Sequence, residues 1–116
     1  ERWNHLHPDE TPRKCYVETC FGDRAGPFVA ATDYMKIVSD QIQGWVPGNF
    51  YSLGTDGYGR SDRRSALREH FEVDRRFIAV TALTALVEDG VLDKKTVAEA
   101  IEKYGIDPDR PDPVTL

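Results

Sequence analysis

The feature that most constrains the fold is a pair of short uncharged runs on either side of one amphipathic segment. Residues 28–32 (FVAAT) carry no charge, as expected for a strand that is covered on both faces. Residues 33–45 form the amphipathic segment, whose apolar residues recur at spacings of 3, 4 and 3 and lie on one helix face: Met35, Val38, Ile42 and Trp45. Pro47-Gly48 ends this helix, and a second strand is predicted at residues 50–55. Strand, helix and strand in so short a span predict a minimal parallel βαβ unit with a right-handed crossover.

Three further helices are predicted, over residues 61–71, 74–89 and 93–104. Each begins next to a side-chain oxygen that can accept a free N–H of the first turn, and the first helix has Thr32 or Asp33 for the same role. The oxygens that precede the three later helices belong to Ser61 or Asp62, Asp74 and Asp93.

The ends and the apolar faces of these helices follow from the same pattern. The helix over residues 74–89 is apolar on most sides, so we expect it to be deeply packed. Gly90 and Gly105 are placed as left-handed helix ends, and Ile106 suits the apolar contact of a Schellman ending.

The chain divides by composition into three parts. Residues 1–27 are predicted to be an extended N-terminal arm and loop, residues 28–106 an α/β domain, and residues 107–116 a proline-rich acidic tail. We expect the tail to be disordered or laid across a partner surface. Because two strands make a weak sheet and the first residue is Glu1, we expect an excerpt of a longer protein whose upstream strands are missing.

Charge and hydropathy exclude two classes of protein. With 15 basic and 20 acidic residues the net charge is −5, whereas a nucleic-acid scaffold needs an excess of basic side chains. The longest apolar stretch, Phe77 to Val87, is far shorter than the ~20 residues of a membrane span. Cys15 and Cys20 are interpreted as two reduced, buried thiols in a cytosolic protein.

The main candidate for a functional site is the glycine-rich loop over residues 54–62 (GTDGYGRSD). It lacks the lysine of a P-loop and the glycine spacing of a dinucleotide fold, and Asp56 and Asp62 would repel a phosphate. Two interpretations stay open, a tight turn before a capped helix and a loop that binds or contacts another domain. The domain-contact candidates are Asp56, Tyr58, Arg60, Ser61 and Asp62, with Arg60 expected to be solvated in this chain alone.

The histidines give weaker signals. His5 and His7, with Asp9 and Glu10 nearby, could hold a metal ion, but solvated or hydrogen-bonding histidines are the favoured interpretation. His70 ends a predicted helix, where a positive charge complements the helix dipole. No hydrolase triad or thiamine-diphosphate metal motif is present in the sequence, so no catalytic, cofactor or metal residue is assigned.

Several segments resemble the C-terminal end of the homodimeric pyruvate dehydrogenase E1 component. They cover nearly the whole chain, and the ten-residue stretch Leu53–Asp62 is the most specific. The others are Arg2–Asn4, Leu6–Pro8, Thr11–Arg13, Thr32–Lys36, His70–Asp74 and Tyr104–Asp107.

This resemblance implies an α/β domain of the transketolase C-terminal type, with a mostly parallel sheet flanked by helices and its first strands before Glu1. It implies a parent oxidoreductase that uses thiamine diphosphate and Mg²⁺ to decarboxylate pyruvate. The parent reductively acetylates the lipoyl group of the E2 component, between glycolysis and acetyl-CoA. The resemblance places the catalytic residues in two preceding domains and implies a cytoplasmic homodimer. The implied partners are the other E1 domains, the second E1 subunit and E2.

An alternative from another class is a free-standing acidic α/β adaptor that binds a protein partner with its helices and its tail. In either case we expect the isolated chain to be inactive. We also expect it to self-associate through its unpaired sheet edges and an uncovered apolar face.

Overall fold

A computed structural model describes all residues, 1–116, as six helices, two strands and two 3₁₀ turns. The strands are β1 (Phe28–Ala31) and β2 (Phe50–Leu53), and the 3₁₀ turns are η1 (Gln43–Trp45) and η2 (Pro113–Thr115). The helices are α1 (Arg2–Leu6), α2 (Tyr16–Phe21), α3 (Lys36–Asp40), α4 (Arg64–His70), α5 (Arg75–Glu88) and α6 (Lys94–Lys103).

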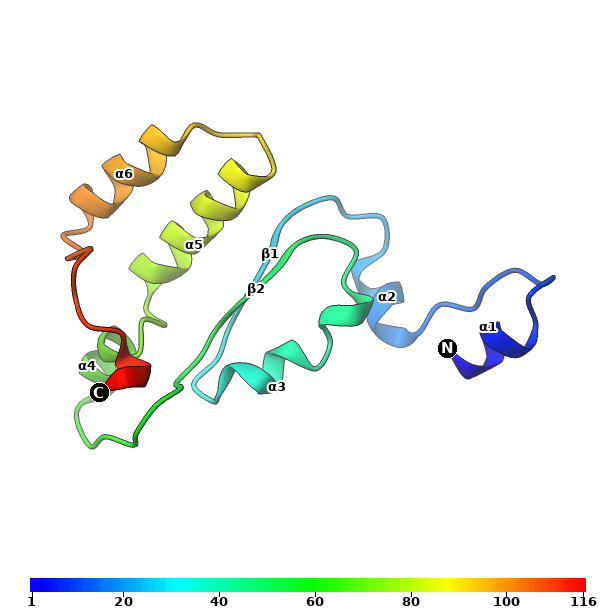
Figure 1. The fold of residues 1–116 in the computed structure, drawn as a ribbon, viewed down its shortest axis with the longest axis horizontal. Coiled ribbons are helices and arrows are strands. Elements are labelled where there is room, and N and C mark those ends of the chain that lie inside the picture. Colours follow the sequence, from blue (N-terminus) through cyan, green and yellow to red (C-terminus); the bar gives the residue numbers. More distant parts are fainter.

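The two strands pair in parallel and form the whole sheet. Phe28 lies opposite Phe50 at one end of the ladder, and Ala31 lies opposite Leu53 at the other. Figure 1 shows α3 on one side of the strands and α5, with α6 outside it, on the other side. The predicted α/β class, with a parallel sheet flanked by helices, is therefore confirmed.

The helix between the strands is shorter than predicted and is capped differently. α3 spans only Lys36–Asp40, and neither Thr32 nor Asp33 caps it. Instead Asp56, which follows β2, accepts a hydrogen bond at 3.0 Å from the Lys36 N–H. The Thr32 hydroxyl accepts from the Tyr34 N–H, so it stabilises a turn before the helix. The prediction of a local cap was wrong because a carboxylate distant in sequence occupies the position.

The helix after the glycine-rich loop also begins later than predicted. α4 starts at Arg64 rather than at residue 61, and its N-cap residue, Arg63, makes no side-chain cap. Asp62 accepts at 2.7 Å from the N–H of the very next residue, Arg63. That geometry belongs to a turn, so neither Ser61 nor Asp62 caps α4.

The two later helices follow their sequence signals. Asp74 accepts from the N–H groups of Arg76 and Phe77 at 3.0 and 3.2 Å, and Asp93 accepts from that of Lys95 at 3.3 Å. Gly90 and Gly105 have φ values of 77° and 65°. Ile106 completes the predicted Schellman ending, because its N–H donates to the carbonyl of residue 101 at 3.1 Å.

The N-terminal arm is more structured than predicted. It contains α1 and α2, and Figure 1 shows α1 lying away from the sheet at one end of the molecule. Trp3 stacks on His7 with ring centroids 4.2 Å apart, and the Arg13 guanidinium lies 3.6 Å from the Trp3 ring centroid. These contacts between aromatic and cationic side chains bend the arm back on itself.

The C-terminal tail folds back onto the chain instead of extending away from it. Figure 1 shows the C-terminus beside α4, and Pro113 in η2 is one of the few buried residues. Arg110 pairs with Glu72 at 3.4 Å and donates to the Glu69 carbonyl at 3.3 Å. The partition of the chain at residues 27 and 106 stays a prediction.

The core of the chain is small. Only 4 of the 116 residues are buried, and Ala85 is the one member of α5 among them, so the prediction of a deeply packed α5 was wrong. The accessible surface is 8651 Å², against about 6,400 Å² for a compact protein of this mass. The radius of gyration is 17.5 Å, against about 13 Å for a compact domain of this length. Two strands provide too little surface to cover the helices on both sides.

The apolar face predicted for the helix between the strands is mostly uncovered for the same reason, because Met35, Val38 and Trp45 are exposed and only Ile42 is half-buried. Met35 is 58% exposed and Val38 is 51% exposed, and their neighbours Tyr34 and Ile37 are exposed as well. This cluster of four side chains is called the α3 apolar face below. Separately, no helix combines the length and the apolar character that crossing a membrane requires.

Candidate functional site

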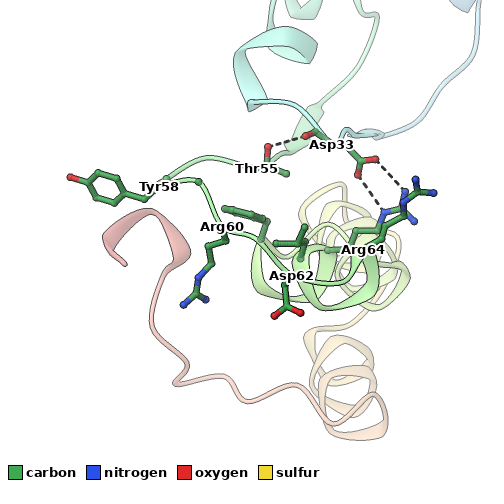
Figure 2. Close-up of a pocket in the computed structure, with 11 residues that line it drawn as sticks. Asp33, Thr55, Tyr58, Arg60, Asp62 and Arg64 are labelled. Atoms are coloured by element: carbon green, nitrogen blue, oxygen red, sulfur yellow. Dashed lines mark hydrogen bonds and ion pairs between the residues drawn. The ribbon is translucent and has the colours of Figure 1, made fainter.

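A hollow of about 430 Å³ lies between the glycine-rich loop and α4, beyond the carboxyl ends of the strands. The residues that follow β2 form one wall, and α4 forms the other with Arg64, Leu67 and Arg68. Figure 2 shows these side chains together with Asp33, which follows β1. The hollow therefore collects polar side chains from both strand ends, where open α/β sheets place their functional loops.

The structure brings together three of the five residues predicted as contact candidates. Tyr58, Arg60 and Asp62 line the hollow, and Figure 2 shows the Tyr58 ring directed away from the other two side chains. Asp56 lies outside it, because its carboxylate binds the start of α3. Ser61 is exposed and also lies outside the lining.

An ion pair closes one side of the hollow. Arg68 donates from Nη2 to Oδ2 of Asp33 at 3.2 Å and from Nε to Oδ1 at 3.4 Å. These hydrogen bonds lower the pKa of Asp33, and the same contacts raise the pKa of Arg68. Local sequence patterns do not reveal this pair, because Asp33 stands where they predict only a cap for the following helix.

A second arginine is held by a histidine. Nη1 of Arg60 lies 2.8 Å from Nδ1 of His70. A guanidinium can only donate, so the imidazole nitrogen accepts and the His70 ring is neutral in this contact. Burial lowers the pKa of His70, and the charges of Arg60 and Arg110 lower it further. A charged His70 at the end of α4 was therefore a wrong prediction, and Arg60 is not the fully solvated side chain that was expected.

The third arginine, Arg64, has no partner. It makes no hydrogen bond and no ion pair within the protein, although it lines the hollow. Arg64 and Arg68 are four residues apart and so share one face of α4. That spacing was the signal in the sequence that could have placed both arginines beside the loop.

The tail closes the far side of the loop. Gly57 has φ of 110°, and a Cβ added there would lie 2.8 Å from the Pro113 carbonyl oxygen. Any larger residue at this position is strained and collides with the tail. Glu72, which pairs with Arg110, is the one non-glycine residue with positive φ, at 59°. The tail thus holds both the loop and the turn between α4 and α5.

The structure offers no metal centre. No three side chains of His, Cys, Asp or Glu come close enough together to hold a metal ion. His7 contacts the Trp3 carbonyl through Nδ1 at 2.8 Å and stacks on the Trp3 ring, which favours the hydrogen-bonding interpretation of this histidine. Both cysteines are free, but Cys20 is exposed and Cys15 is only half-buried, so the expectation of buried thiols was wrong.

The resemblance also implies thiamine diphosphate and Mg²⁺ for the parent enzyme. Neither the Gly-Asp-Gly start nor the downstream asparagine pair of that cofactor's metal motif is present in this sequence, whose two asparagines are Asn4 and Asn49.

The histidine in the hollow yields a pH prediction. Because its pKa is lowered from 6.5 in the folded state, the unfolded chain binds more protons near that pH, and stability falls as pH falls through 6.5. We expect the His70 ring carbons to titrate below 6.5 by NMR. Arg60→Gln should raise the midpoint of His70, because it removes one of the charges that lower it. A His70 midpoint at or above 6.5 would contradict this assignment, as would a midpoint that Arg60→Gln leaves unchanged.

Comparisons with known proteins place the chain in a family. A family model described as the transketolase-like TK C-terminal domain matches residues 2–74. The pyruvate dehydrogenase E1 component of Pseudomonas aeruginosa is 55% identical over 115 residues, which cover 98% of this chain and 13% of that protein. The E1 component of Escherichia coli K12 is 52% identical over 114 residues, covering 97% and 13%. That of Mycolicibacterium smegmatis is 44% identical over 107 residues, covering 92% and 12%.

These matches confirm the resemblance found in the sequence. The chain spans about an eighth of the length of these relatives, so it corresponds to one segment of proteins with this name. The chain belongs to the transketolase-like C-terminal domain family.

Proposed function

We propose that this chain is the C-terminal, non-catalytic structural domain of a pyruvate dehydrogenase E1 component. The observation that carries the proposal is an identity of 55% across 98% of the chain, to a protein of which the match covers only 13%. The parent enzyme would decarboxylate pyruvate with thiamine diphosphate and Mg²⁺ and reductively acetylate the lipoyl group of E2. We prefer this role to that of a free-standing adaptor, because the relatives are far longer than this chain.

A structural role agrees with how much surface the chain leaves uncovered. The α3 apolar face exposes four large side chains, and both outer strand edges are unpaired. Surfaces of this kind are covered in a stable protein, here by other domains of the same E1 chain or by the second E1 subunit of a homodimer. The proposal includes a cytoplasmic location for the parent enzyme and its E2 partner.

The glycine-rich loop is proposed to contact a neighbouring domain or subunit near the entrance of the active site. Of its five candidate residues, Asp56 and Asp62 are already held by backbone N–H groups, and Arg60 is held by His70. Tyr58 is 78% exposed and makes no hydrogen bond in the chain, so it is the residue best placed for such a contact.

The isolated chain should bind no thiamine diphosphate and should not decarboxylate pyruvate. The reason is that the sequence lacks the metal motif of thiamine-diphosphate enzymes, with its Gly-Asp-Gly start and downstream asparagine pair. Calorimetric titration of the chain with the cofactor and Mg²⁺ tests this, with the full-length parent enzyme as the positive control. Micromolar binding at one site per isolated chain would overturn the non-catalytic assignment.

The loop contact is tested with Tyr58→Ala. In the full-length parent we expect a loss of about 1–3 kcal/mol of stability, because an exposed aromatic residue would lose its partner surface. In the isolated chain the loss should stay within about 0.5 kcal/mol, because the side chain has no partner there. Thermal melts of both proteins supply the comparison. An equal loss in the two proteins would mean that Tyr58 serves only its own loop.

The isolated chain should self-associate through the α3 apolar face. Val38→Glu introduces a charge on that face and should shift the species seen by sedimentation towards the monomer. Val91→Glu is the matched control, because Val91 is 66% exposed in the turn between α5 and α6, away from the face. A wild-type chain that stays monomeric at high concentration would contradict the expectation, as would equal effects of the two variants.

A further inference from the structure

The glycine-rich loop is fastened to α4 by a single side-chain pair. Nη1 of Arg60 donates to Nδ1 of His70 at 2.8 Å. No other hydrogen bond or ion pair joins residues 57–62 to another element, because Asp62 accepts only from the N–H of the residue that follows it. These loop residues are all exposed. The position of the loop therefore depends on whether Arg60 and His70 stay in contact.

The pair can exist only while the histidine is neutral. A guanidinium has donors and no acceptor, so the lone pair of His70 Nδ1 must receive the Arg60 N–H. When the ring takes up a proton, both of its nitrogens carry hydrogen and no lone pair is left. Two positive charges then face each other at hydrogen-bond distance, where like charges repel. One proton thus turns an attractive contact into a repulsive one.

The charges around His70 oppose its protonation. Arg60 faces the ring from the loop and Arg110 from the C-terminal tail, while Glu72, in the turn after α4, is the facing carboxylate. Glu72 is already paired with Arg110 at 3.4 Å, and the half-buried ring packs edge-on against Phe71. Burial is the main cause of the lowered pKa of His70, the two arginines lower it further, and Glu72 partly offsets them. The contact is therefore intact at neutral pH and is lost in acid.

Breaking the pair frees the loop between two fixed points. At its start, Gly57 lies against the tail, since a Cβ there would meet the Pro113 carbonyl oxygen at 2.8 Å. At its end, α4 begins at Arg64. Between these points, a Cβ added at Gly59 would meet nothing within 4 Å, so no neighbouring atom obstructs movement there. Tyr58 lines the hollow from this part of the loop, so release of the loop moves one wall of the hollow.

We propose that Arg60 and His70 form a pH-sensitive latch, which holds the glycine-rich loop against α4 while His70 is neutral and releases the loop when His70 is protonated. The latch requires no ligand and goes beyond the structural role proposed above. Tyr58 stands two residues before Arg60, so the latch determines how this exposed side chain is presented. In the full-length parent, acid therefore changes the surroundings of Tyr58, with or without a neighbouring domain in contact with it.

Fluorine NMR of the full-length parent protein, labelled with 3-fluorotyrosine, tests the latch. The variant Tyr58→Phe identifies the Tyr58 resonance by its disappearance. As the pH falls from neutral, that resonance should move, with a midpoint below 6.5 that coincides with the midpoint of the His70 ring. The population of released loop should rise by roughly tenfold, the factor that corresponds to the loss of one hydrogen bond.

Three variants separate the latch from other effects of acid. His70→Gln keeps an acceptor for Arg60 but takes up no proton, so the Tyr58 resonance should stay at its neutral position throughout. Arg60→Ala removes the donor, so the resonance should already lie at its acid position in neutral solution. His5→Gln is the matched control and should leave the transition unchanged, because His5 is an exposed histidine in α1.

Three results would overturn the proposal. One is a Tyr58 resonance that does not respond to pH in the wild-type protein. Another is a response that His70→Gln retains, since the responding group would then be a different acid or base. The third is a resonance that Arg60→Ala leaves at the wild-type position in neutral solution, which would mean that the loop keeps its place without the pair.

Discussion

The rest of the structure depends on the small size of the sheet, because two short parallel strands cannot cover the helices packed on them. β1 and β2 contribute four residues each, so the sheet is narrower than the helical layers on its two sides. α5 consequently buries one residue completely, although its sequence is apolar around most of its circumference. The energy of a hydrophobic core grows with the apolar area removed from water, at about 25 cal/mol per Å². For this chain, most of that buried apolar area must come from contacts with surfaces outside the chain.

The carboxyl edge of the sheet is the part that the chain determines by itself. The Thr55 N–H donates to the Tyr34 carbonyl at 2.8 Å, and the Asp56 side chain binds the Lys36 N–H. Gly54 between them is fully buried, and a Cβ there would lie 2.6 Å from the Lys36 nitrogen. Each strand end therefore positions the turn after the other strand. The loop that lines the hollow starts from a fixed point, although the loop itself makes few internal hydrogen bonds.

The sequence could predict interactions between residues that are close together in the chain, but not those between distant residues. The caps at Asp74 and Asp93 and the ending at Gly105 depend on groups within a few residues, and the structure has them as predicted. Thr32 and Asp33 do not cap α3, because the carboxylate of Asp56, twenty residues after Lys36, accepts from the Lys36 N–H. The burial of α5 could not be predicted. The periodicity of a helix identifies the apolar face that should be covered, but it does not show which surface covers that face.

The same difference between local and long-range interactions applies to the candidate site. The glycine-rich loop was recognisable from its composition. The four-residue spacing of Arg64 and Arg68 also indicates that both lie on one face of the helix that follows the loop. The bidentate pair between Arg68 and Asp33 spans 35 residues, so local sequence patterns could not reveal it. The position of Asp56 outside the hollow was equally hidden, and it removes one of the two carboxylates that the sequence placed there.

The C-terminal tail contacts both the glycine-rich loop and the turn after α4. Glu72 adopts a left-handed backbone conformation, which costs a non-glycine residue on the order of 1 kcal/mol or more. Such a conformation persists only where surrounding contacts determine it. Here the Schellman ending of α4 does so, because the Val73 N–H donates to the Arg68 carbonyl at 2.9 Å and the Glu72 N–H to the Glu69 carbonyl at 3.2 Å. The ion pair with Arg110 adds a contact from the tail. On the other side of the tail, the Pro113 carbonyl lies against Gly57, where no side chain fits. A change in the tail therefore reaches the hollow through Gly57, and it reaches the turn after α4 through Arg110, so the last ten residues act as part of the site's scaffold.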